Sequence, residues 1–217
     1  MINQKSILRK DLDLVKELFP KLTFKSSKKY KAWYLIGDLD ICDAKGVYWN
    51  TFNIKIVIPQ TYPYCVPVVI EKSSLIPRED DRHISEQGVC CLDVDHKLLV
   101  MAKRGIRLLD FIKQKVYPYF ANQLYFEAEG HYAAGEFSHG FAGIKDFYLK
   151  DLKLSEIETI ISFIEMVLNN TIPGRNDLCP CNSGEKLKNC HLDAVDLLRS
   201  IRREQLTQDL QCFNSLE

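Results

Sequence analysis

The sequence has no excess of either charge and no long apolar run. Its 29 Lys and Arg residues balance its 29 Asp and Glu residues, so the formal net charge is zero. A balanced charge gives no reason to expect nucleic acid as a partner. No apolar stretch is long enough to span a bilayer, and Met1 to Lys10 lacks the apolar core of a signal peptide. We therefore expect a cytoplasmic protein with neither a membrane nor a nucleic acid as its partner.

Internal repeats and low-complexity segments are also missing, which excludes repeat arrays and biased, disordered chains. What is present is 46% hydrophobic residues and 27% charged residues, a balance typical of globular proteins. A chain of 217 residues can form one core of ordinary size and a small additional unit.

The eight cysteines fall into two kinds. In a cytoplasmic protein we expect thiols or metal ligands rather than disulfides. Cys42, Cys65 and Cys212 stand alone in apolar or helical surroundings, and we predict that they are buried, inert thiols. The remaining five form an adjacent pair in one loop and a compact group near the C-terminus.

The first part of the chain predicts an α+β fold. Residues 5–19 have the spacing of an amphipathic helix, closed by a proline. Strands are predicted over 32–42, 47–58 and 68–70, and their short connections favour an antiparallel meander. The lysine-rich run at 25–31 is either a docking patch for an acidic partner or a solvated loop, and we favour the loop.

The pattern changes after the last predicted strand. Residues 73–98 are polar and irregular, and a loop of this length is usually functional or disordered. Helical periodicity follows over 105–127, with a bend or interruption at Pro118, and again over 144–148, 154–168 and 193–213. The clearest boundary in the chain is Thr171-Ile172-Pro173-Gly174.

The long polar loop holds a group of residues whose side chains could take part in a reaction. Cys91 lies beside Cys90 and follows Gly88, and as a thiolate it can carry an acyl group as a thioester. His83 can act as a base for an incoming amine or donate to an oxyanion, and a structural role for it stays open. Asp93 can orient a lysine or cap a turn. Two structural thiols are the alternative interpretation of the cysteine pair. Since successive side chains in extended backbone face opposite ways, we predict that Cys90 points into the core.

The order of helix, antiparallel meander, proline turn, cysteine loop and helices resembles the ubiquitin-conjugating enzyme (UBC) fold. That family has a Tyr-Pro-x-x-x-Pro turn, seen here at 62–67, then a histidine, then a Gly-x-x-Cys-Leu segment. The resemblance covers roughly residues 5–150 and implies a four-stranded meander flanked by helices. It also implies that Cys91 is the catalytic cysteine and that His83 assists it.

The sequence departs from the eukaryotic family pattern at one point. Those members have His-Pro-Asn, whose Asn helps to stabilise the oxyanion, whereas this chain has His83-Ile84-Ser85. The loop, and the segment at 135–141, are more similar to bacterial relatives in anti-phage operons, including cyclic-oligonucleotide-based anti-phage signalling (CBASS). This resemblance implies an acyl donor, either a ubiquitin-like protein or the C-terminus of a CD-NTase-type nucleotidyltransferase. The acceptor would be a lysine or a small amine.

No loop in the sequence resembles a nucleotide-binding loop, so a separate activating enzyme would normally load the cysteine. A direct reaction without that enzyme also stays open. Inactive members of the fold hold partners without chemistry, and the missing Asn keeps a binding or scaffold protein as the alternative function.

The C-terminal group has the pattern C-x-C-x8-C-H. Cys179, Cys181, Cys190 and His191 offer four ligands within a short segment, and Gly184 permits the turn between them. Three thiolates and an imidazole suit tetrahedral zinc, and four protein ligands leave no open position, which predicts a structural Zn2+. So short a segment has almost no core, so metal binding would supply most of its folding free energy. A redox pair is the rival interpretation.

Residues 173–191 closely resemble the SEC-C motif, a small zinc-binding element. Asn182 and Leu178 are minor departures from its usual Gly and Pro. Lys186 and Lys188 make its surface basic, which would suit an acidic protein partner. We therefore predict a conjugating domain at 1–150, a connecting helix at 151–172, the zinc motif at 173–192 and a C-terminal helix at 193–217.

Overall fold

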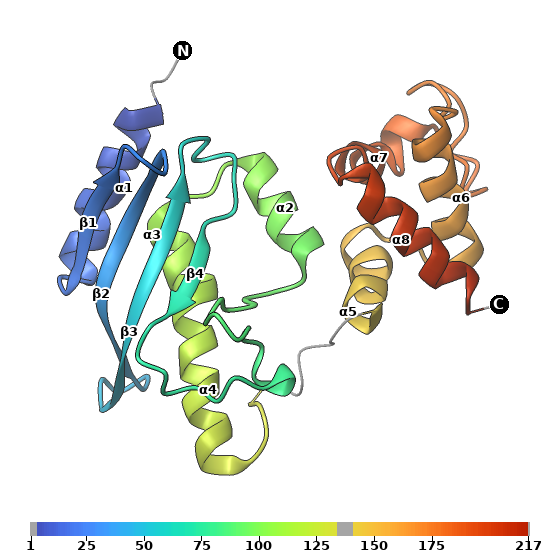
Figure 1. Ribbon diagram of the computed structural model, residues 1–217. Helices are drawn as coiled ribbons and strands as arrows, with labels where there is room; N and C mark the ends of the chain where they lie inside the picture. The colour runs from blue at the N-terminus through green and yellow to red at the C-terminus, as the bar shows by residue number, and fades with distance from the viewer. Residues whose placement is uncertain (1–3, 134–140, 217) are drawn as a thin grey trace. The chain divides into compact units, whose positions relative to one another are not determined.

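The computed structural model describes residues 4–133 and 141–216. It has an α+β fold with a four-stranded antiparallel sheet of order β1-β2-β3-β4 (Figure 1). Contacts divide the chain into two compact units, Met1–Asp93 with Met101–Glu136 and Val94–Val100 with Phe137–Glu217. The boundaries predicted at residues 150, 172 and 192 stay predictions.

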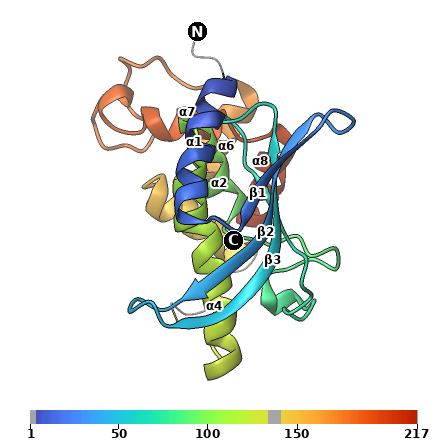
Figure 2. The same ribbon diagram turned by 90° about the vertical axis from the view of Figure 1, so that its left-hand side faces the viewer.

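The first unit contains the sheet and the helices that cover it. Its elements are α1 (Gln4–Leu18), β1 (Leu22–Ser27), β2 (Ala32–Cys42), β3 (Tyr48–Pro59), β4 (Val68–Glu71), a 3-10 turn (Asp80–Arg82), α3 (Leu108–Phe111), a π-helical turn (Ile112–Val116) and α4 (Tyr117–Glu129). Helix α2 (Asp95–Arg104) contributes residues to both units. Helices α1, α3 and α4 lie against one face of the sheet (Figures 1 and 2).

The sheet follows the predicted alternation. Ile54, Ile56 and Ile58 of β3 are fully buried, and Lys55 and Val57 between them are half-buried on the opposite face. Strand β1 was not predicted, and it includes part of the lysine-rich run that we assigned to a loop. Only Leu22 and Phe24 are apolar in this edge strand, too few to mark an alternation along it. Charged residues on an exposed edge also hinder pairing with other chains.

A buried carboxylate joins α1 to the proline turn. Asp11 accepts hydrogen bonds from the Tyr62 hydroxyl and from Arg107 Nε, the latter at 2.8 Å. The backbone N–H of Leu108 donates to the same Tyr62 hydroxyl at 2.9 Å. The Tyr62–Pro63 peptide bond is cis. Burial, and then the neighbouring carboxylate of Asp11, raise the pKa of Tyr62. The network fixes the turn because each buried polar group has a partner.

The helical region after the loop differs from the prediction where it begins and agrees with it near Pro118. We predicted irregular chain up to Leu98, but α2 already begins at Asp95, and Leu98 and Ala102 form its buried stripe. The helix predicted over 105–127 is divided by the π-helical turn that precedes Pro118. Proline lacks the N–H that continues an α-helical ladder, which accounts for the interruption.

The second unit is helical in its described part. Its elements are α5 (Phe141–Asp146), a π-helical turn (Phe147–Asp151), α6 (Ile157–Asn169), a 3-10 turn (Leu187–Asn189), α7 (Leu192–Leu198) and α8 (Arg203–Asn214). We predicted one helix over 193–213, but the chain breaks between α7 and α8. Ser200 and Ile201 donate to carbonyls three residues back, at 2.9 and 3.0 Å, and Ile201 is buried at the break.

A buried polar network lies in this second unit. His96 Nε2 lies 2.7 Å from Asp209 Oδ2, and the Tyr148 hydroxyl donates to the same oxygen at 2.8 Å. Gln205 donates to the other carboxylate oxygen at 3.1 Å. His96 and Asp209 are each 1% exposed, so the core of this unit includes a residue from the chain segment directly after the cysteine loop.

Candidate functional site

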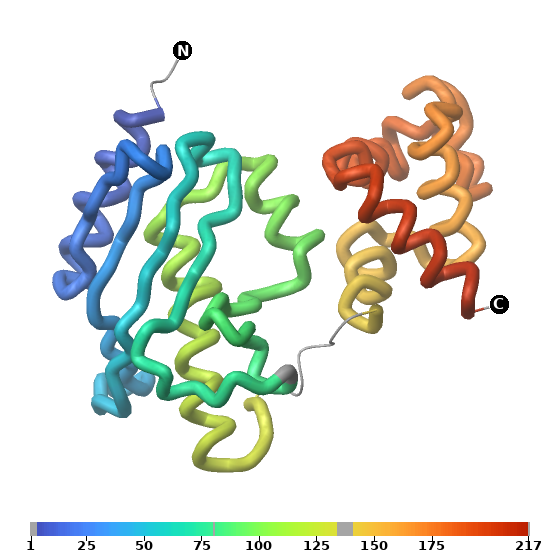
Figure 3. The backbone as a smooth tube through the Cα atoms, viewed as in Figure 1, coloured from blue at the N-terminus to red at the C-terminus, as the bar shows by residue number. Residues whose placement is uncertain are grey.

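The candidate active loop forms a small hairpin that extends the sheet beyond β4. Cys90 N–H donates to Val69 O at 2.9 Å, and Glu71 N–H donates to Gly88 O at 2.8 Å. On its other side, Cys91 N–H donates to His83 O at 2.8 Å. Figure 3 follows the backbone from β4 through this hairpin to α2. The cysteine pair therefore lies on backbone that is hydrogen-bonded on both sides.

Gly88 is required by the close contact between this hairpin and β4. Its φ is +80°, and a Cβ atom there would lie 2.5 Å from the Glu71 carbonyl oxygen. A side chain would both strain the backbone and push the hairpin away from β4. The glycine of the Gly-x-x-Cys segment thus permits the approach of two backbones.

The two adjacent cysteines face opposite ways. Cys90 is buried, and its burial raises the pKa of the thiol to about 12. Cys91 is exposed. The predicted direction of Cys90 is therefore confirmed, and Cys91 is the member of the pair that solvent and a large substrate can reach.

His83 lies next to Cys91 through its backbone. Its carbonyl accepts the Cys91 N–H and also accepts the Tyr119 hydroxyl at 3.1 Å. The imidazole is 9% exposed and packs edge-on against the Tyr132 ring, with centroids 5.7 Å apart. The backbone of His83 has a φ of +52°, a strained conformation that often occurs at functional sites. A catalytic role for His83 stays a prediction.

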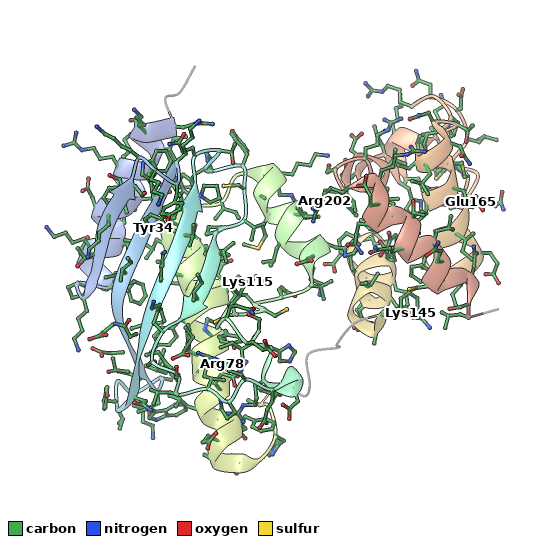
Figure 4. All side chains as sticks on the ribbon, in the orientation of Figure 1. Tyr34, Arg78, Lys115, Lys145, Glu165 and Arg202 are labelled. Atoms are coloured by element: carbon green, nitrogen blue, oxygen red, sulfur yellow. The ribbon has the colours of Figure 1, made fainter. Side chains whose placement is uncertain are left out.

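Asp93 makes an ion pair beside the cysteine loop. Its Oδ2 lies 2.5 Å from Lys115 Nζ, and the two side chains are 11% and 23% exposed. The Cys91 thiol donates weakly to the Asp93 carbonyl oxygen at 3.8 Å. Lys115 lies on the π-helical turn between α3 and α4, and Figure 4 labels it. Sequence reasoning missed Lys115 because it lies 22 residues from Asp93, and no local pattern in the sequence links the two residues.

A second ion pair supports the loop from the β4 side. The Glu71 carboxylate is fully buried and lies 2.5 Å from Arg78 NH2, which Figure 4 labels. The same carboxylate accepts the backbone N–H of Ser74 at 3.1 Å and the hydroxyl of Ser73. Sequence reasoning also missed this pair, because the spacing of the two residues does not show that the Glu71 carboxylate is buried. It fixes the chain at the point where β4 passes into the loop.

The three isolated cysteines are less uniform than we predicted. Cys42 and Cys65 are half-buried, and burial raises the pKa of the Cys65 thiol. Cys212 on α8 is exposed, so the prediction of a buried thiol is wrong there. It lies on the solvent side of an amphipathic helix, next to the buried Phe213. His139 lies outside the described residues, as does most of the segment at 135–141.

The four predicted ligands in the second unit converge. Their ligand atoms all lie within 4.8 Å of one another. Cys179 Sγ and Cys190 Sγ lie 3.4 and 3.1 Å from His191 Nδ1, and Cys181 Sγ lies 3.5 Å from Cys190 Sγ. Ligands at tetrahedral zinc are about 3.5–3.8 Å apart, given Zn–S and Zn–N bonds of about 2.3 and 2.0 Å. The donor set and spacing therefore fit a tetrahedral metal ion.

Local backbone hydrogen bonds build this cluster. Cys179 N–H donates to Glu185 O at 2.8 Å, and Leu187 N–H donates to Asp177 O at 2.9 Å, which closes a tight ribbon. Gly184 has a φ of +77° in the turn of that ribbon. Leu187 is fully buried in the core of the second unit. The ribbon and its core contact place the first two cysteines opposite the last two ligands.

The outer contacts of the cluster also suit a metal. His191 Nε2 lies 3.1 Å from Lys153 O, an arrangement that leaves Nδ1 to face the three sulfur atoms. Burial raises the pKa of Cys179. Burial also acts to raise the pKa of Cys181, but hydrogen bonds from the Ser183 side chain and backbone outweigh it and lower that pKa to about 6. A thiolate is the form that binds a metal.

Comparison with known proteins identifies a motif at the C-terminal Cys/His cluster. The model of the SEC-C motif, a zinc-binding motif, matches residues 175–193. The chain is 65% identical over 26 residues to the protein translocase subunit SecA of Chlorobium luteolum, and 84% identical over 19 residues to SecA of Chlorobium phaeobacteroides. These matches cover 12% and 9% of this chain and 2% of each SecA, so the similarity concerns the metal cluster alone. No solved structure matches the chain significantly.

No helix in the described part of the chain has the length and hydropathy needed to cross a membrane.

Proposed function

We propose that this protein is a ubiquitin-conjugating-enzyme-like acyl carrier whose nucleophile is Cys91. The observation that carries the proposal is the exposed thiol of Cys91 on a hairpin held by hydrogen bonds on both sides. A loaded thioester needs such a place, because it must stay ordered while an amine approaches it. The order of helix, antiparallel sheet, proline turn, cysteine loop and helices agrees with the UBC fold that the sequence resembles.

The chemistry is transfer in two steps. The Cys91 thiolate attacks the activated C-terminal carbonyl of the donor and expels its leaving group. An acceptor amine then attacks the thioester and releases the Cys91 thiolate. The donor is a ubiquitin-like protein or a CD-NTase-type nucleotidyltransferase, and the acceptor is a lysine or a small amine. A separate activating enzyme supplies the energy, and the setting is bacterial anti-phage defence of the CBASS kind.

His83 has a narrower role in this proposal than the sequence alone would give it. Its carbonyl holds the Cys91 N–H, so this amide does not serve as an oxyanion donor in the resting protein. Its ring packs edge-on against Tyr132. We assign the backbone of His83 to the placement of Cys91 and its imidazole to assistance in transfer, so His83→Asn should lower transfer more than loading.

We further propose that Cys179, Cys181, Cys190 and His191 hold a structural Zn2+. When bound, the ion would supply folding free energy to the ribbon, and four protein ligands would leave no position for a substrate. The basic surface of the motif would then suit an acidic protein partner, as the sequence predicts.

Intact-mass spectrometry tests the carrier role. The protein is expressed with its neighbouring genes and measured native and denatured, with and without a thiol reductant, for wild type and Cys91→Ser. We expect a protein adduct that reductant removes from wild type and that persists as an ester in Cys91→Ser. Absence of any adduct, with a native mass higher by one zinc, would leave only the metal site standing.

A binding or scaffold protein is the second candidate. A cavity of about 580 Å3 between α1 and β1 favours it, with Leu12, Leu22 and Trp33 in the lining and Lys5 and Arg9 among its charged residues. Under this alternative, a partner would stay bound non-covalently in native mass spectra and Cys91→Ala would leave that complex intact. A complex that disappears with Cys91 would count against it.

A further inference from the structure

Lys115 is held in an unusual place for a lysine. Its ammonium lies 2.5 Å from Asp93, and both side chains are largely shielded from solvent. Ion pairs removed from bulk water are screened less than surface pairs. The lysine projects from a π-helical turn, a feature that frequently occurs at functional sites.

The same short segment holds the lysine and the candidate nucleophile. Asp93 follows Cys91 by two residues, and the Cys91 thiol lies 3.8 Å from the Asp93 carbonyl oxygen. Through its carboxylate, Asp93 holds an amine two residues along the chain from the residue that would carry the acyl group. An amine that reaches a thioester within the same protein has the advantage of an intramolecular reaction.

We propose that Lys115 is a self-acylation site of this protein and that the ion pair with Asp93 withholds it from reaction. The inference rests on the acyl-carrier function proposed above. An ammonium held by a carboxylate is protonated, so it has no lone pair to attack a carbonyl. Loss of the Asp93 charge frees the side chain to lose a proton to solvent and to react.

The reaction needs no further reactant. Neutral Lys115 Nζ attacks the acyl carbon of the Cys91 thioester, and a C–N bond forms as the C–S bond breaks. The electron pair leaves with Cys91 Sγ, and the proton released from nitrogen passes to solvent. The product is an amide on Lys115 and a free thiol on Cys91, a dead end because the amide no longer carries the acyl group in activated form.

A synthetic peptide ending in Gly-Gly, supplied as its mercaptoethanesulfonate thioester, serves as the probe. It loads Cys91 by thioester exchange and needs no activating enzyme. After loading, intact mass is measured with and without reductant, and peptide mapping locates the adduct. We expect wild type to carry a reductant-sensitive adduct on Cys91, and Asp93→Asn to convert it about tenfold faster into a resistant adduct on Lys115.

Matched variants separate this effect from a general disturbance. Asp93→Asn with Lys115→Arg should lose the resistant adduct, whereas Asp93→Asn with Lys113→Arg should keep it, since Lys113 is an exposed lysine on the same turn. Glu86→Gln removes an exposed carboxylate from the same hairpin and should behave as wild type.

Two outcomes would overturn the inference in different ways. A Cys91 adduct in Asp93→Asn that stays sensitive to reductant, or a resistant adduct that maps to another lysine, overturns the self-acylation site alone. If no variant forms an adduct on Cys91, the carrier function fails and this inference falls with it.

Discussion

The two groups of cysteines differ in where their side chains point. Cys90 and Cys91 are adjacent on extended backbone, so one is buried and the other exposed. Cys179, Cys181 and Cys190 lie on a ribbon and a turn that bring their sulfur atoms together with an imidazole. Thiols that point apart, as in Cys90 and Cys91 (the divergent pair), suit a nucleophile beside a structural residue. Thiols that point together, as in the C-terminal group (the convergent group), suit a metal ion. Backbone conformation, rather than the number of cysteines, decides which chemistry a group can perform.

The strongest test of this comparison replaces Cys90 and Cys91 by alanine, one at a time. Cys91→Ala should abolish the covalent adduct completely, because no other thiol occupies its position. Cys90→Ala should keep the adduct and lose about 1 kcal/mol of stability, a typical cost for a buried substitution. The measurement is intact mass after loading, together with urea unfolding. Loss of the adduct in Cys90→Ala alone would place the nucleophile one residue earlier.

The convergent group should respond as a unit. Cys190→Ser, or a strong chelator, should remove one zinc from the native mass and unfold the ribbon. The local loss is expected to be several kcal/mol, since structural zinc sites contribute folding free energy of that order or more. Native mass and hydrogen exchange over 175–191 report it. A ribbon that stays protected without metal would show that its hydrogen bonds suffice.

Alkylation should separate Cys90 from Cys91 by rate. With a pKa of about 12 for Cys90, only about one molecule in ten thousand has this thiolate at pH 8, so iodoacetamide should modify Cys91 and leave Cys90 intact until the protein unfolds. The unfolded thiol ionises at lower pH, so Cys90 contributes stability that is lost as the pH rises from about 9 to 12. Peptide mapping after a timed reaction checks the rates, and equal labelling of the two would refute the assignment.

Two glycines with similar φ give the smallest and most local test. In Gly88→Ala the new Cβ meets the Glu71 carbonyl at 2.5 Å, whereas in Gly184→Ala nothing lies within 4 Å. Both variants carry the strain of a left-handed backbone, about 1 kcal/mol, and only Gly88→Ala adds a clash. Gly88→Ala should therefore cost about 2 kcal/mol or more and slow Cys91 loading, while Gly184→Ala should cost about half as much. Equal melting temperatures would contradict the role given to the β4 contact.

Local signals predicted the parts of the structure that depend on local spacing. Strand β2 was predicted with its bounds because Ala32–Cys42 is one apolar-rich segment that ends at turn-forming residues. The four ligands lie within thirteen residues, so their convergence follows from one ribbon. The direction of Cys90 followed from the alternation of extended backbone in the same way.

Other features depend on neighbours that are distant in the sequence. Strand β1 is defined by its pairing with β2 and has almost no apolar pattern of its own. The partner of Asp93 is known only once the π-helical turn is placed beside the cysteine loop. The break between α7 and α8 depends on burial of Ile201, an apolar residue that fits a continuous helix equally well. Periodicity cannot resolve such features, because each depends on the folded topology.

The buried His96 limits where the chain can be cut into fragments that fold. The helical unit with the metal cluster draws Val94–Val100 from the middle of the chain, and His96 bonds there to Asp209. A chain that stops at Glu136 would leave this histidine without its carboxylate, and a fragment that starts at Phe137 would lack the histidine. This unit is therefore not a simple C-terminal tail. Its insertion or loss as a whole would also require a change in the segment at Val94–Val100.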